Sequence, residues 1–285
     1  MAIDLKKALD LRAEGQEFAY TDRETMLYAL GVGMGADPLN RDELPFVYEN
    51  GLRVLPTQAT VISWGAGRTL ETGINFMMVV HGEQRLTVHK PLPDRGTITT
   101  DWRITDVIDK GAGKGAILVG ETVIKDKASG EKLVTLVSST FARADGGFGG
   151  ASEGGPQPHP TPTRAPDAEL AIRTRPDQAL LYRLSGDRNP LHSDPDFAKA
   201  AGFDKPILHG LCTYGVTCRA VLATYCKFDP TLIRGHDVRF SAPVFPGETI
   251  VTRMWKDGNI ISFEASVKER PGVTVIKNGK TTLAA

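Results

Sequence analysis

Runs of apolar and β-branched residues fall into two groups along the chain, one group in each half. In the first half they cover residues 75–80 continuing through 84–89, then 97–108, 115–126 and 132–143. In the second half they cover residues 232–241, 249–256, 259–269 and 273–283. Because these runs are rich in Val, Ile and Thr and are separated by Gly, Asp and Pro, they predict two sets of β-strands.

Helices are predicted ahead of the strands in the first half. Thr21-Asp22-Arg23-Glu24 is a capping-box pattern, in which the first and fourth side chains bond free backbone N–H groups. A helix carrying Leu27 and Leu30 is expected after it. The stretch from Thr57 to Arg68 predicts a second helix, rich in Gly and Ala.

The second half repeats this order. A helix is expected from Thr174-Arg175-Pro176-Asp177 to Gly186, where glycine suits the residue after a helix end. A short helix is expected after Ser193-Asp194-Pro195. The stretch from Leu211 to Tyr225 is largely apolar, which predicts a helix buried on most sides.

The segment from Gly146 to Pro166 separates the two halves. It holds six Gly and five Pro in 21 residues, a composition that no regular element tolerates. A weak repeat supports duplication, since Pro91–Ile98 precedes Trp102 and Pro243–Ile250 precedes Trp255. We therefore expect residues 1–145 and 167–285 to be two α+β halves, each an antiparallel sheet around a mostly apolar helix.

Charge and composition narrow the function classes. The chain has 34 basic and 34 acidic residues, so it lacks the net positive charge that nucleic-acid binding favours. No apolar run approaches the ~20 residues of a membrane helix, and the charged N-terminus has no signal-peptide pattern. The three cysteines, at positions 212, 218 and 226, do not predict a disulfide framework or a zinc site. We expect a cytoplasmic protein that binds neither nucleic acid nor membrane.

The densest polar cluster is Ser185-Gly186-Asp187-Arg188-Asn189-Pro190-Leu191-His192. It is expected to form one short loop between two helices, with Asp187, Asn189 and His192 held together. A carboxylate beside an imidazole can share acid and base roles or polarise one water molecule. The alternative is a loop whose Asp and Asn side chains only cap the neighbouring helices, and spacing alone leaves both interpretations open.

Two further positions are candidates for substrate contact. Gly210 begins the apolar helix, where a free N–H group at the positive end of the helix dipole suits an oxyanion; alternatively, Gly210 merely allows close packing. His209 before it is interpreted as a structural, hydrogen-bonded residue. His81-Gly82-Glu83-Gln84 interrupts apolar strand sequence, which by itself indicates only a kink or bulge at Gly82.

Other sequence patterns are weaker indications of function than these. Gly31-Val32-Gly33-Met34-Gly35-Ala36 matches a dinucleotide-binding spacing but ends a predicted helix instead of following a strand. Lys110 and Lys114 flank an expected hairpin tip, where they are placed to meet a phosphate. Cys212 is interpreted as an inert core thiol. His, Cys and carboxylate residues show no convincing metal spacing, so no metal is expected.

The segment Tyr182–Pro195, continued by Gly202-Phe203 and Lys205–Thr213, resembles the MaoC-type (R)-specific enoyl-CoA hydratases. This family is also called hydratase 2 and includes the hydratase domain of peroxisomal multifunctional enzymes. Further matching segments are Tyr28–Gly33, Leu55–Thr57, His81–Gln84, Lys90–Pro93, Asp109–Gly111, Gly146–Gly150, Arg239-Phe240 and Pro246-Gly247. The resemblance covers nearly the whole chain.

This resemblance implies a double hot-dog fold and hydration of trans-2-enoyl-CoA to (3R)-3-hydroxyacyl-CoA. It assigns catalysis to the second half and the acyl chain to a non-catalytic first half. The catalytic residues it implies are Asp187, His192, Asn189 and Gly210. The substrate-binding residues it implies are His81, Gly82, Lys110, Arg188, Pro190, Leu191 and Phe240.

The resemblance also implies a homodimer with an acyl-CoA thioester as substrate and no cofactor beyond the CoA that the substrate carries. Hot-dog folds host several reactions, so two enzymatic alternatives remain open. These are an acyl-CoA thioesterase and a dehydratase of 3-hydroxyacyl groups on acyl-carrier protein. A non-catalytic acyl-CoA-binding module is a third, against which the complete Asp187–His192 loop argues.

Overall fold

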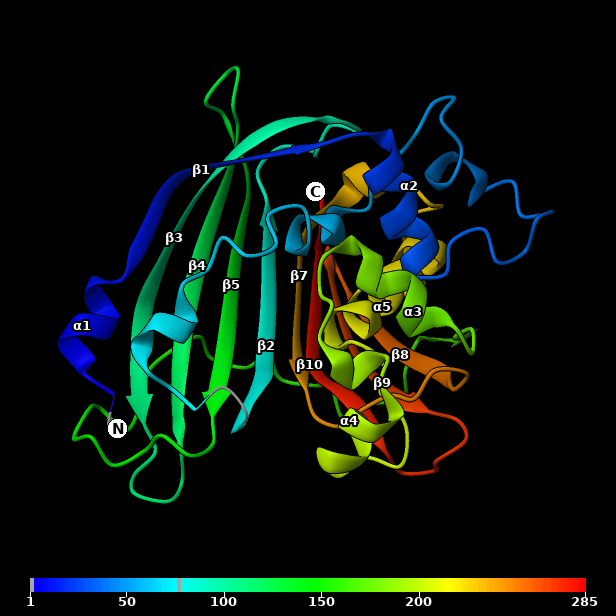
Figure 1. The fold of residues 1–285 in the computed structure, drawn as a ribbon. Helices are drawn as coiled ribbons and strands as arrows, with labels where there is room; N and C mark the ends of the chain where they lie inside the picture. Colours follow the sequence, from blue (N-terminus) through cyan, green and yellow to red (C-terminus); the bar gives the residue numbers. More distant parts are fainter. Residues whose placement is uncertain (1–2, 76–77) are drawn as a thin grey trace.

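A ten-stranded antiparallel sheet runs through the protein, and the computed structural model describes residues 3–75 and 78–285 of it (Figure 1). The first half supplies β1 (Arg12–Tyr20), β2 (Val79–Val88), β3 (Gly96–Asp109), β4 (Ala116–Asp126) and β5 (Lys132–Ala142). The second half supplies β6 (Ala168–Arg173), β7 (Ile233–Phe240), β8 (Thr249–Asp257), β9 (Ile260–Val267) and β10 (Thr274–Leu283). The strands predicted from both groups of apolar runs are confirmed, except that residues 76–77 of the predicted strand 75–80 lie outside the described residues.

The strand order shows that the two halves repeat one topology. The order is β1-β3-β4-β5-β2 in the first half and, read from the opposite edge, β6-β8-β9-β10-β7 in the second. The repeated Pro-containing segments lead into β3 and β8, which occupy equivalent places. The edge strands β1 and β6 were not predicted, because alternating exposed polar residues break up their apolar pattern.

The helices are short apart from one. They are α1 (Leu5–Asp10), α2 (Asp22–Gly31), α3 (Gln178–Tyr182), α4 (Pro195–Ala200) and α5 (Gly210–Tyr225), with 3-10 turns η1 (Leu44–Phe46), η2 (Pro56–Thr60), η3 (Thr69–Thr72), η5 (Arg183–Ser185), η6 (Pro190–His192) and η7 (Pro230–Leu232). The predicted capping box at Thr21 and Glu24 is present at the start of α2. The apolar α5 lies against the strands of the second half, in the place expected for its central helix (Figure 1).

The first half has no equivalent of α5 among its described residues, so the predicted helix over Thr57–Arg68 is wrong. Only η2 is helical there, and the chain then turns at Gly65, which has a φ of 91°. Gly67 follows, with the indole nitrogen of Trp102 3.2 Å from an ideal Cβ. Glycine and β-branched residues both disfavour a helix interior, and this stretch contains both.

The Gly/Pro-rich segment 146–166 contains no helix or strand, as predicted, and it is tied across the outer face of the sheet. We call it the strap. At one end the Asp109 carboxylate accepts hydrogen bonds from Gly147 and Gly149 at 2.7 Å, and these N–H groups lower the Asp109 pKa to about 2. Further along, Asn278 donates to the His159 carbonyl at 2.8 Å, and Trp255 donates to the Arg164 carbonyl at 2.8 Å.

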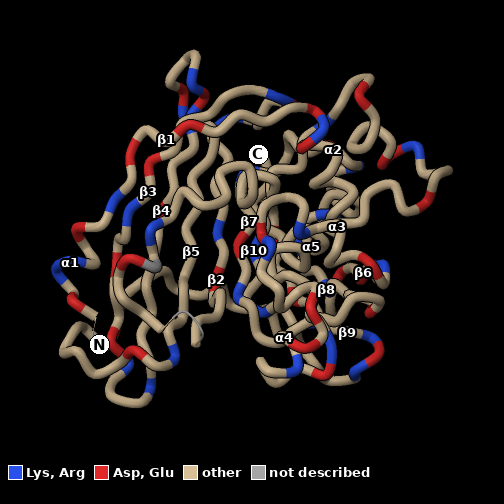
Figure 2. Tube along the Cα trace, in the orientation of Figure 1, with Lys and Arg blue, Asp and Glu red and all other residues tan. Residues whose placement is uncertain are grey.

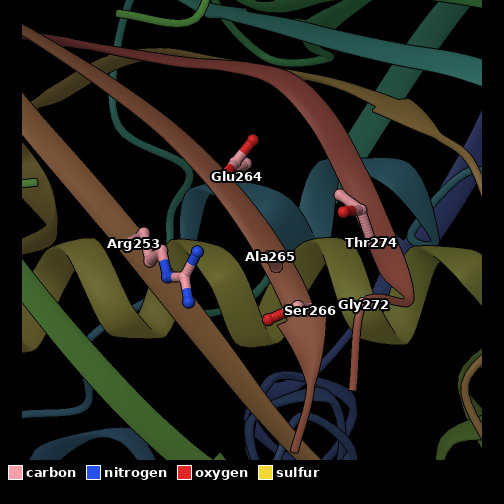
Figure 3. Close-up of a pocket in the computed structure, with 6 residues that line it drawn as sticks. All are labelled: Arg253, Glu264, Ala265, Ser266, Gly272 and Thr274. Atoms are coloured by element: carbon pink, nitrogen blue, oxygen red, sulfur yellow. The ribbon is translucent and has the colours of Figure 1, made fainter. Parts of the chain in front are cut away.

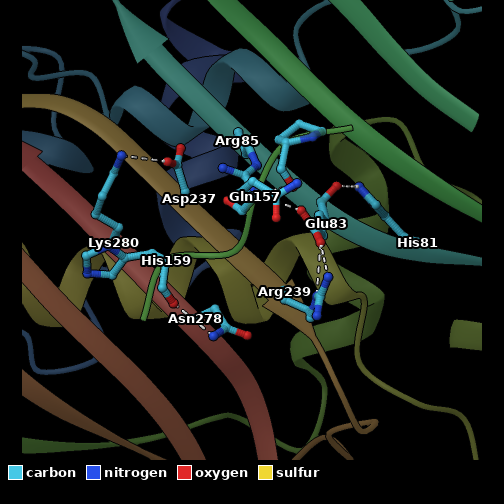
Figure 4. Close-up of polar contacts among 10 residues, drawn as sticks. His81, Glu83, Arg85, Gln157, His159, Asp237, Arg239, Asn278 and Lys280 are labelled. Carbon is cyan, nitrogen blue, oxygen red and sulfur yellow. Dashed lines mark hydrogen bonds and ion pairs between the residues drawn. The ribbon is translucent and has the colours of Figure 1, made fainter. Parts of the chain in front are cut away.

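The two halves meet where β2 pairs with β7, from Glu83 opposite Arg239 to Thr87 opposite Gly235. Figure 4 shows the polar contacts at this junction, where Glu83 accepts hydrogen bonds from Arg239 at 2.6 Å and from Arg85 at 3.0 Å. Within the described residues the pairing of β2 with β7 ends at Glu83 and Arg239. His81 and Phe240 therefore lie just beyond it, at a fork between the two half-sheets.

Candidate active site

The polar cluster Ser185–His192 lies between the helices α3 and α4, as the sequence predicts, and it includes the last residue of η5 and all of η6. Gly186 has a φ of 140°, a backbone conformation that glycine adopts readily and other residues do not. The Asn189 side chain accepts the Leu191 N–H at 3.0 Å, and the Asp187 Oδ1 accepts the Asn189 N–H at 3.0 Å. The capping interpretation is thus correct for Asn189, the N-cap of η6, whereas Asp187 bonds the loop backbone, and that bond holds its carboxylate in place.

Asp187 and His192 form the acid–base arrangement expected of a catalytic pair. The Oδ2 of Asp187 is 3.9 Å from the Nε2 of His192. The other ring nitrogen, Nδ1, lies 2.9 Å from the Ile207 carbonyl. Because a carbonyl only accepts, Nδ1 carries the proton and Nε2 presents a lone pair towards Asp187. Burial lowers the His192 pKa, so the imidazole is neutral and basic near neutral pH.

His209 supports both members of this pair. Its ring stacks on His192 with centroids 3.6 Å apart, and its Nε2 donates to the Asp187 carbonyl at 3.1 Å. The Tyr182 ring lies on its other side, 4.9 Å away. Burial lowers the His209 pKa to about 3, so the ring stays neutral. His209 is thus hydrogen-bonded, as predicted, and its contact with Asp187 could not be predicted from the sequence.

Asp187, His192 and His209 each have a possible metal-ligand atom, and these three atoms all lie within 4.8 Å of one another. The group is therefore a candidate metal site. Metals bind imidazole along the lone pair in the ring plane. The His192 and His209 rings are stacked with centroids 3.6 Å apart at an angle of 25°, so their in-plane lone pairs lie in two separate, nearly parallel planes. The His209 Nε2 also donates to the Asp187 carbonyl. The arrangement therefore suits proton transfer better than metal binding.

Gly210 is the first residue of α5 and is exposed. Its N–H group belongs to the first helical turn, whose N–H groups point outward without helical partners. The Phe240 ring would lie 3.4 Å from an ideal Cβ on Gly210. The contact with Phe240 fits the packing interpretation of this glycine, and the role of its N–H group as an oxyanion donor stays a prediction.

His81, Gly82 and Phe240 border the same place from the fork between β2 and β7. The His81 and Phe240 rings are 5.0 Å apart, and burial lowers the His81 pKa to about 4. The predicted bulge at Gly82 is confirmed, because the β2–β5 register shifts between His81 and Glu83. An added Cβ on Gly82 would lie 3.2 Å from the Ser139 carbonyl.

The remaining predicted contacts lie further out. Arg188 and Pro190 are exposed on the loop, and Leu191 is half-buried beside His192. Lys110 follows the end of β3, and its ammonium donates to the Ser152 carbonyl of the strap at 2.9 Å. The structure therefore places Lys110 against the strap, at the end of β3, with β4 and β5 between β3 and β2.

Two other features, a buried cysteine and a surface hollow, are further candidates for a functional site. Cys212 is fully buried and donates to the Gly31 carbonyl, and burial raises its pKa, as expected for an inert thiol. A shallow hollow on the outer face is lined by Arg253, Glu264, Ala265, Ser266, Gly272 and Thr274 (Figure 3). It lies on the opposite side of the sheet from α5 and has no contact with the Asp187–His192 loop.

Comparison with known proteins places this geometry in a family. Residues 158–278 match the MaoC like domain, and residues 18–144 match the MFE-2 hydratase 2 N-terminal domain. The chain is 41% identical over 282 residues to enoyl-CoA hydratase ChsH3 of Mycobacterium tuberculosis, which covers 97% of each chain. It is also 41% identical over 278 residues to the peroxisomal enoyl-CoA hydratase 2 of Arabidopsis thaliana, which covers 89% of this chain and 87% of that one.

A crystal structure of a MaoC-like dehydratase from Phytophthora capsici superposes with a TM-score of 0.88 at 32% identity. The superposition covers 99% of this chain and 98% of that one. No helix in residues 3–75 or 78–285 is long and apolar enough to cross a membrane. The chain belongs to the MaoC-like hydratase 2 family and has a double hot-dog fold.

Proposed function

We propose that the protein is an (R)-specific 2-enoyl-CoA hydratase, a hydro-lyase that reversibly adds water to trans-2-enoyl-CoA to give (3R)-3-hydroxyacyl-CoA. The observation that carries this proposal is the 3.9 Å separation between the Asp187 carboxylate and the unprotonated nitrogen of His192. Hydrogen bonds of about 2.8 Å to both atoms fit one water molecule across that gap. Relatives that match nearly the whole chain are named enoyl-CoA hydratases.

The reaction follows from the positions of three groups. The Gly210 N–H donates to the thioester carbonyl, where negative charge develops as the β-carbon is attacked; one such donor is worth about 3 kcal/mol. Asp187 and His192 hold the water and take its proton as its oxygen bonds to C3. The electron pair of the double bond moves towards the thioester, and C2 then receives a proton from the pair.

The stereochemistry of the addition follows from the proposed mechanism, because the acid–base groups lie on one side of the substrate. The hydroxyl oxygen and the new hydrogen are delivered to the same face, so the addition is syn and yields one enantiomer. Asn189 contributes by fixing the loop that carries Asp187. His81, Gly82, Phe240, Arg188, Pro190 and Leu191 surround the reaction centre as substrate contacts, and Lys110 is the outermost one.

In this proposal the two halves of the chain have different roles in catalysis and substrate binding. Residues 167–285 supply Asp187, His192 and Gly210, whereas residues 1–145 bind the acyl chain and the strap joins them. The acid–base pair supplies every proton that hydration needs, so the proposal includes no metal or redox cofactor beyond substrate CoA. Activity is accordingly expected to survive prolonged dialysis against EDTA.

Incubation with trans-2-decenoyl-CoA tests the proposal. Loss of the conjugated enoyl absorbance and release of free thiol are followed together, and the product enantiomers are then resolved. We expect absorbance loss without thiol release, giving only the 3R alcohol. Thiol release without a hydroxyacyl product would instead assign the same loop to thioester hydrolysis. A parallel reaction with the acyl-carrier-protein thioester separates hydratase from carrier-protein dehydratase.

We further propose that the protein is a cytoplasmic homodimer. The sheet leaves β1 and β6 as edges, and unpaired edges are common sites of association between copies. Because the relative from Arabidopsis thaliana is named as peroxisomal, the compartment is tested by fractionation and the oligomeric state by sedimentation.

A further inference from the structure

One large aromatic side chain from the first half lies directly on the catalytic loop of the second. An ideal Cβ built on Gly186 would be 2.8 Å from the Cβ and Cγ of Trp64 and 3.3 Å from its Cδ1. Glycine at 186, with its φ of 140°, is what allows the two segments to touch. Since Asp187 is the next residue, Trp64 packs against the backbone that leads directly into the acid–base pair.

The indole of Trp64 is unusual in remaining accessible. Its exposed fraction is 43%, whereas Trp102 and Trp255 are each 4% exposed. Burial of apolar surface is the main source of binding energy for an acyl chain. An accessible indole beside a reaction centre is therefore available surface for the apolar part of a substrate.

The chain after Trp64 leads away from the loop across the first half. Residues 61–68 connect η2 to η3 and cross in front of the first-half strands (Figure 1). Gly67 on this path lies against Trp102. Trp102 belongs to a separate apolar cluster with Ile74, Ile104 and Leu118. Trp64 thus stands at the boundary between the catalytic loop and the apolar interior of the first half.

We propose that Trp64 is a specificity-determining residue, whose indole contacts the acyl carbons immediately beyond the reacting double bond and favours longer chains. This inference rests on the proposed hydratase function and adds a residue from the other half to its site. A short enoyl group ends before it reaches the indole, whereas a longer one covers it. Trp64 should therefore affect substrates according to their length.

The test compares Trp64→Ala and Trp64→Phe with the wild type on trans-2-butenoyl-CoA and trans-2-decenoyl-CoA. An indole that covers about two methylene groups gives about a tenfold effect. We expect Trp64→Ala to lower kcat/KM for the decenoyl substrate about tenfold through KM, with the butenoyl substrate changed less than about twofold. Trp64→Phe should lie between. Leu39→Ala is the control, because Leu39 is an apolar residue 86% exposed on a distant loop.

Equal losses on both substrates would overturn the proposal, because they would show that Trp64 only supports the Gly186 backbone. Unchanged kinetics on both, or a gain on the longer substrate, would overturn it as well. Fluorescence separates this result from failure of the hydratase proposal. Saturated decanoyl-CoA should change the emission of the wild type and not that of Trp64→Phe, whether or not enoyl-CoA is hydrated. A wild-type emission that does not respond would also overturn the inference.

Discussion

His209 holds Asp187 by its backbone and not by its carboxylate. The Nε2–H of His209 donates to the Asp187 carbonyl at 3.1 Å, while its ring stacks on the other member of the catalytic pair. Asp187 keeps both carboxylate oxygens for the Asn189 N–H and the side facing His192. His209, the residue before Gly210, therefore contacts both Asp187 and His192 and helps to set their relative position.

Replacing His209 should slow the reaction without weakening substrate binding. In His209→Ala the carbonyl of Asp187 loses its donor, and a shift of about 1 Å in a catalytic group can cost about a hundredfold. We expect kcat to fall by about that factor with KM little changed. His209→Gln places a donor near the Nε2 position and should recover a large part of kcat. Equal loss in both variants at unchanged Tm would contradict this positioning role.

Removing either member of the acid–base pair should have the largest effect on turnover. Asp187→Asn keeps the size of the side chain and removes its charge, and His192→Gln removes the basic nitrogen. Each is expected to lower kcat by about 10²–10⁴-fold, and the double variant should lose far less than the product of the two. Asp196→Asn, in the first turn of the nearby α4, is the control. Near-normal turnover in Asp187→Asn would refute the assignment.

Two buried histidines should make the protein sensitive to acid. Burial lowers the pKa of both His209 and His236 to about 3, whereas an unfolded histidine titrates near 6.5. Above about pH 6.5 both histidines are neutral in the folded and in the unfolded state, so they do not change the free energy of unfolding. As the pH falls below that value, only the unfolded state takes up protons, so the free energy of unfolding drops by about 1.4 kcal/mol per pH unit for each histidine until the folded pKa is approached.

Urea unfolding between neutral pH and pH 5 measures this slope. His236→Asn should reduce the slope by the share of one histidine even if it also lowers stability at neutral pH. His89→Gln is the matched control because His89 is exposed. A slope that His236→Asn leaves unchanged would show that other groups cause the acid sensitivity.

The junction between the halves offers a prediction about stability. The Glu83 carboxylate, 10% exposed, accepts hydrogen bonds from both Arg85 and Arg239. Glu83→Gln leaves two guanidinium groups facing a neutral amide, and we expect a loss of about 1–3 kcal/mol in the free energy of unfolding. The control is Glu169→Gln, which breaks an exposed ion pair with Arg253 and should cost less than about 1 kcal/mol. Equal losses would argue against a special role for the junction.

The sequence predicted the parts of the fold that depend on local pattern. Strands rich in Val, Ile and Thr, the capping box at Thr21 and the apolar α5 were all found where expected. The predicted helix over Thr57–Arg68 is wrong because its Gly and β-branched residues disfavour a helix, and the contact of Gly67 with Trp102 adds a long-range preference that local pattern does not encode. Strand β1 was not predicted because Gly15 and exposed charged residues interrupt its alternation of apolar and polar positions.

Part of the candidate site could likewise be predicted from the local sequence, and part of it depends on long-range contacts. Asp187, Asn189 and His192 share one loop, so their proximity could be predicted from spacing. The placement of Gly210 and Phe240 beside them rests on the resemblance to a family, since segments far apart in the chain meet there. Trp64 carries no sequence signal, because its contact with Gly186 joins residues more than a hundred positions apart.

The matching strand orders of the two halves have a consequence for how such a chain can change. In a symmetric pair of identical subunits, every substitution appears twice and alters both copies of the site. Here one chain carries two versions of the same sheet, and only one keeps the long helix with the acid–base loop beside it. Under the proposed division of roles, mutations in the other version can reshape substrate preference without altering the acid–base residues, so that selectivity and catalysis can be selected independently.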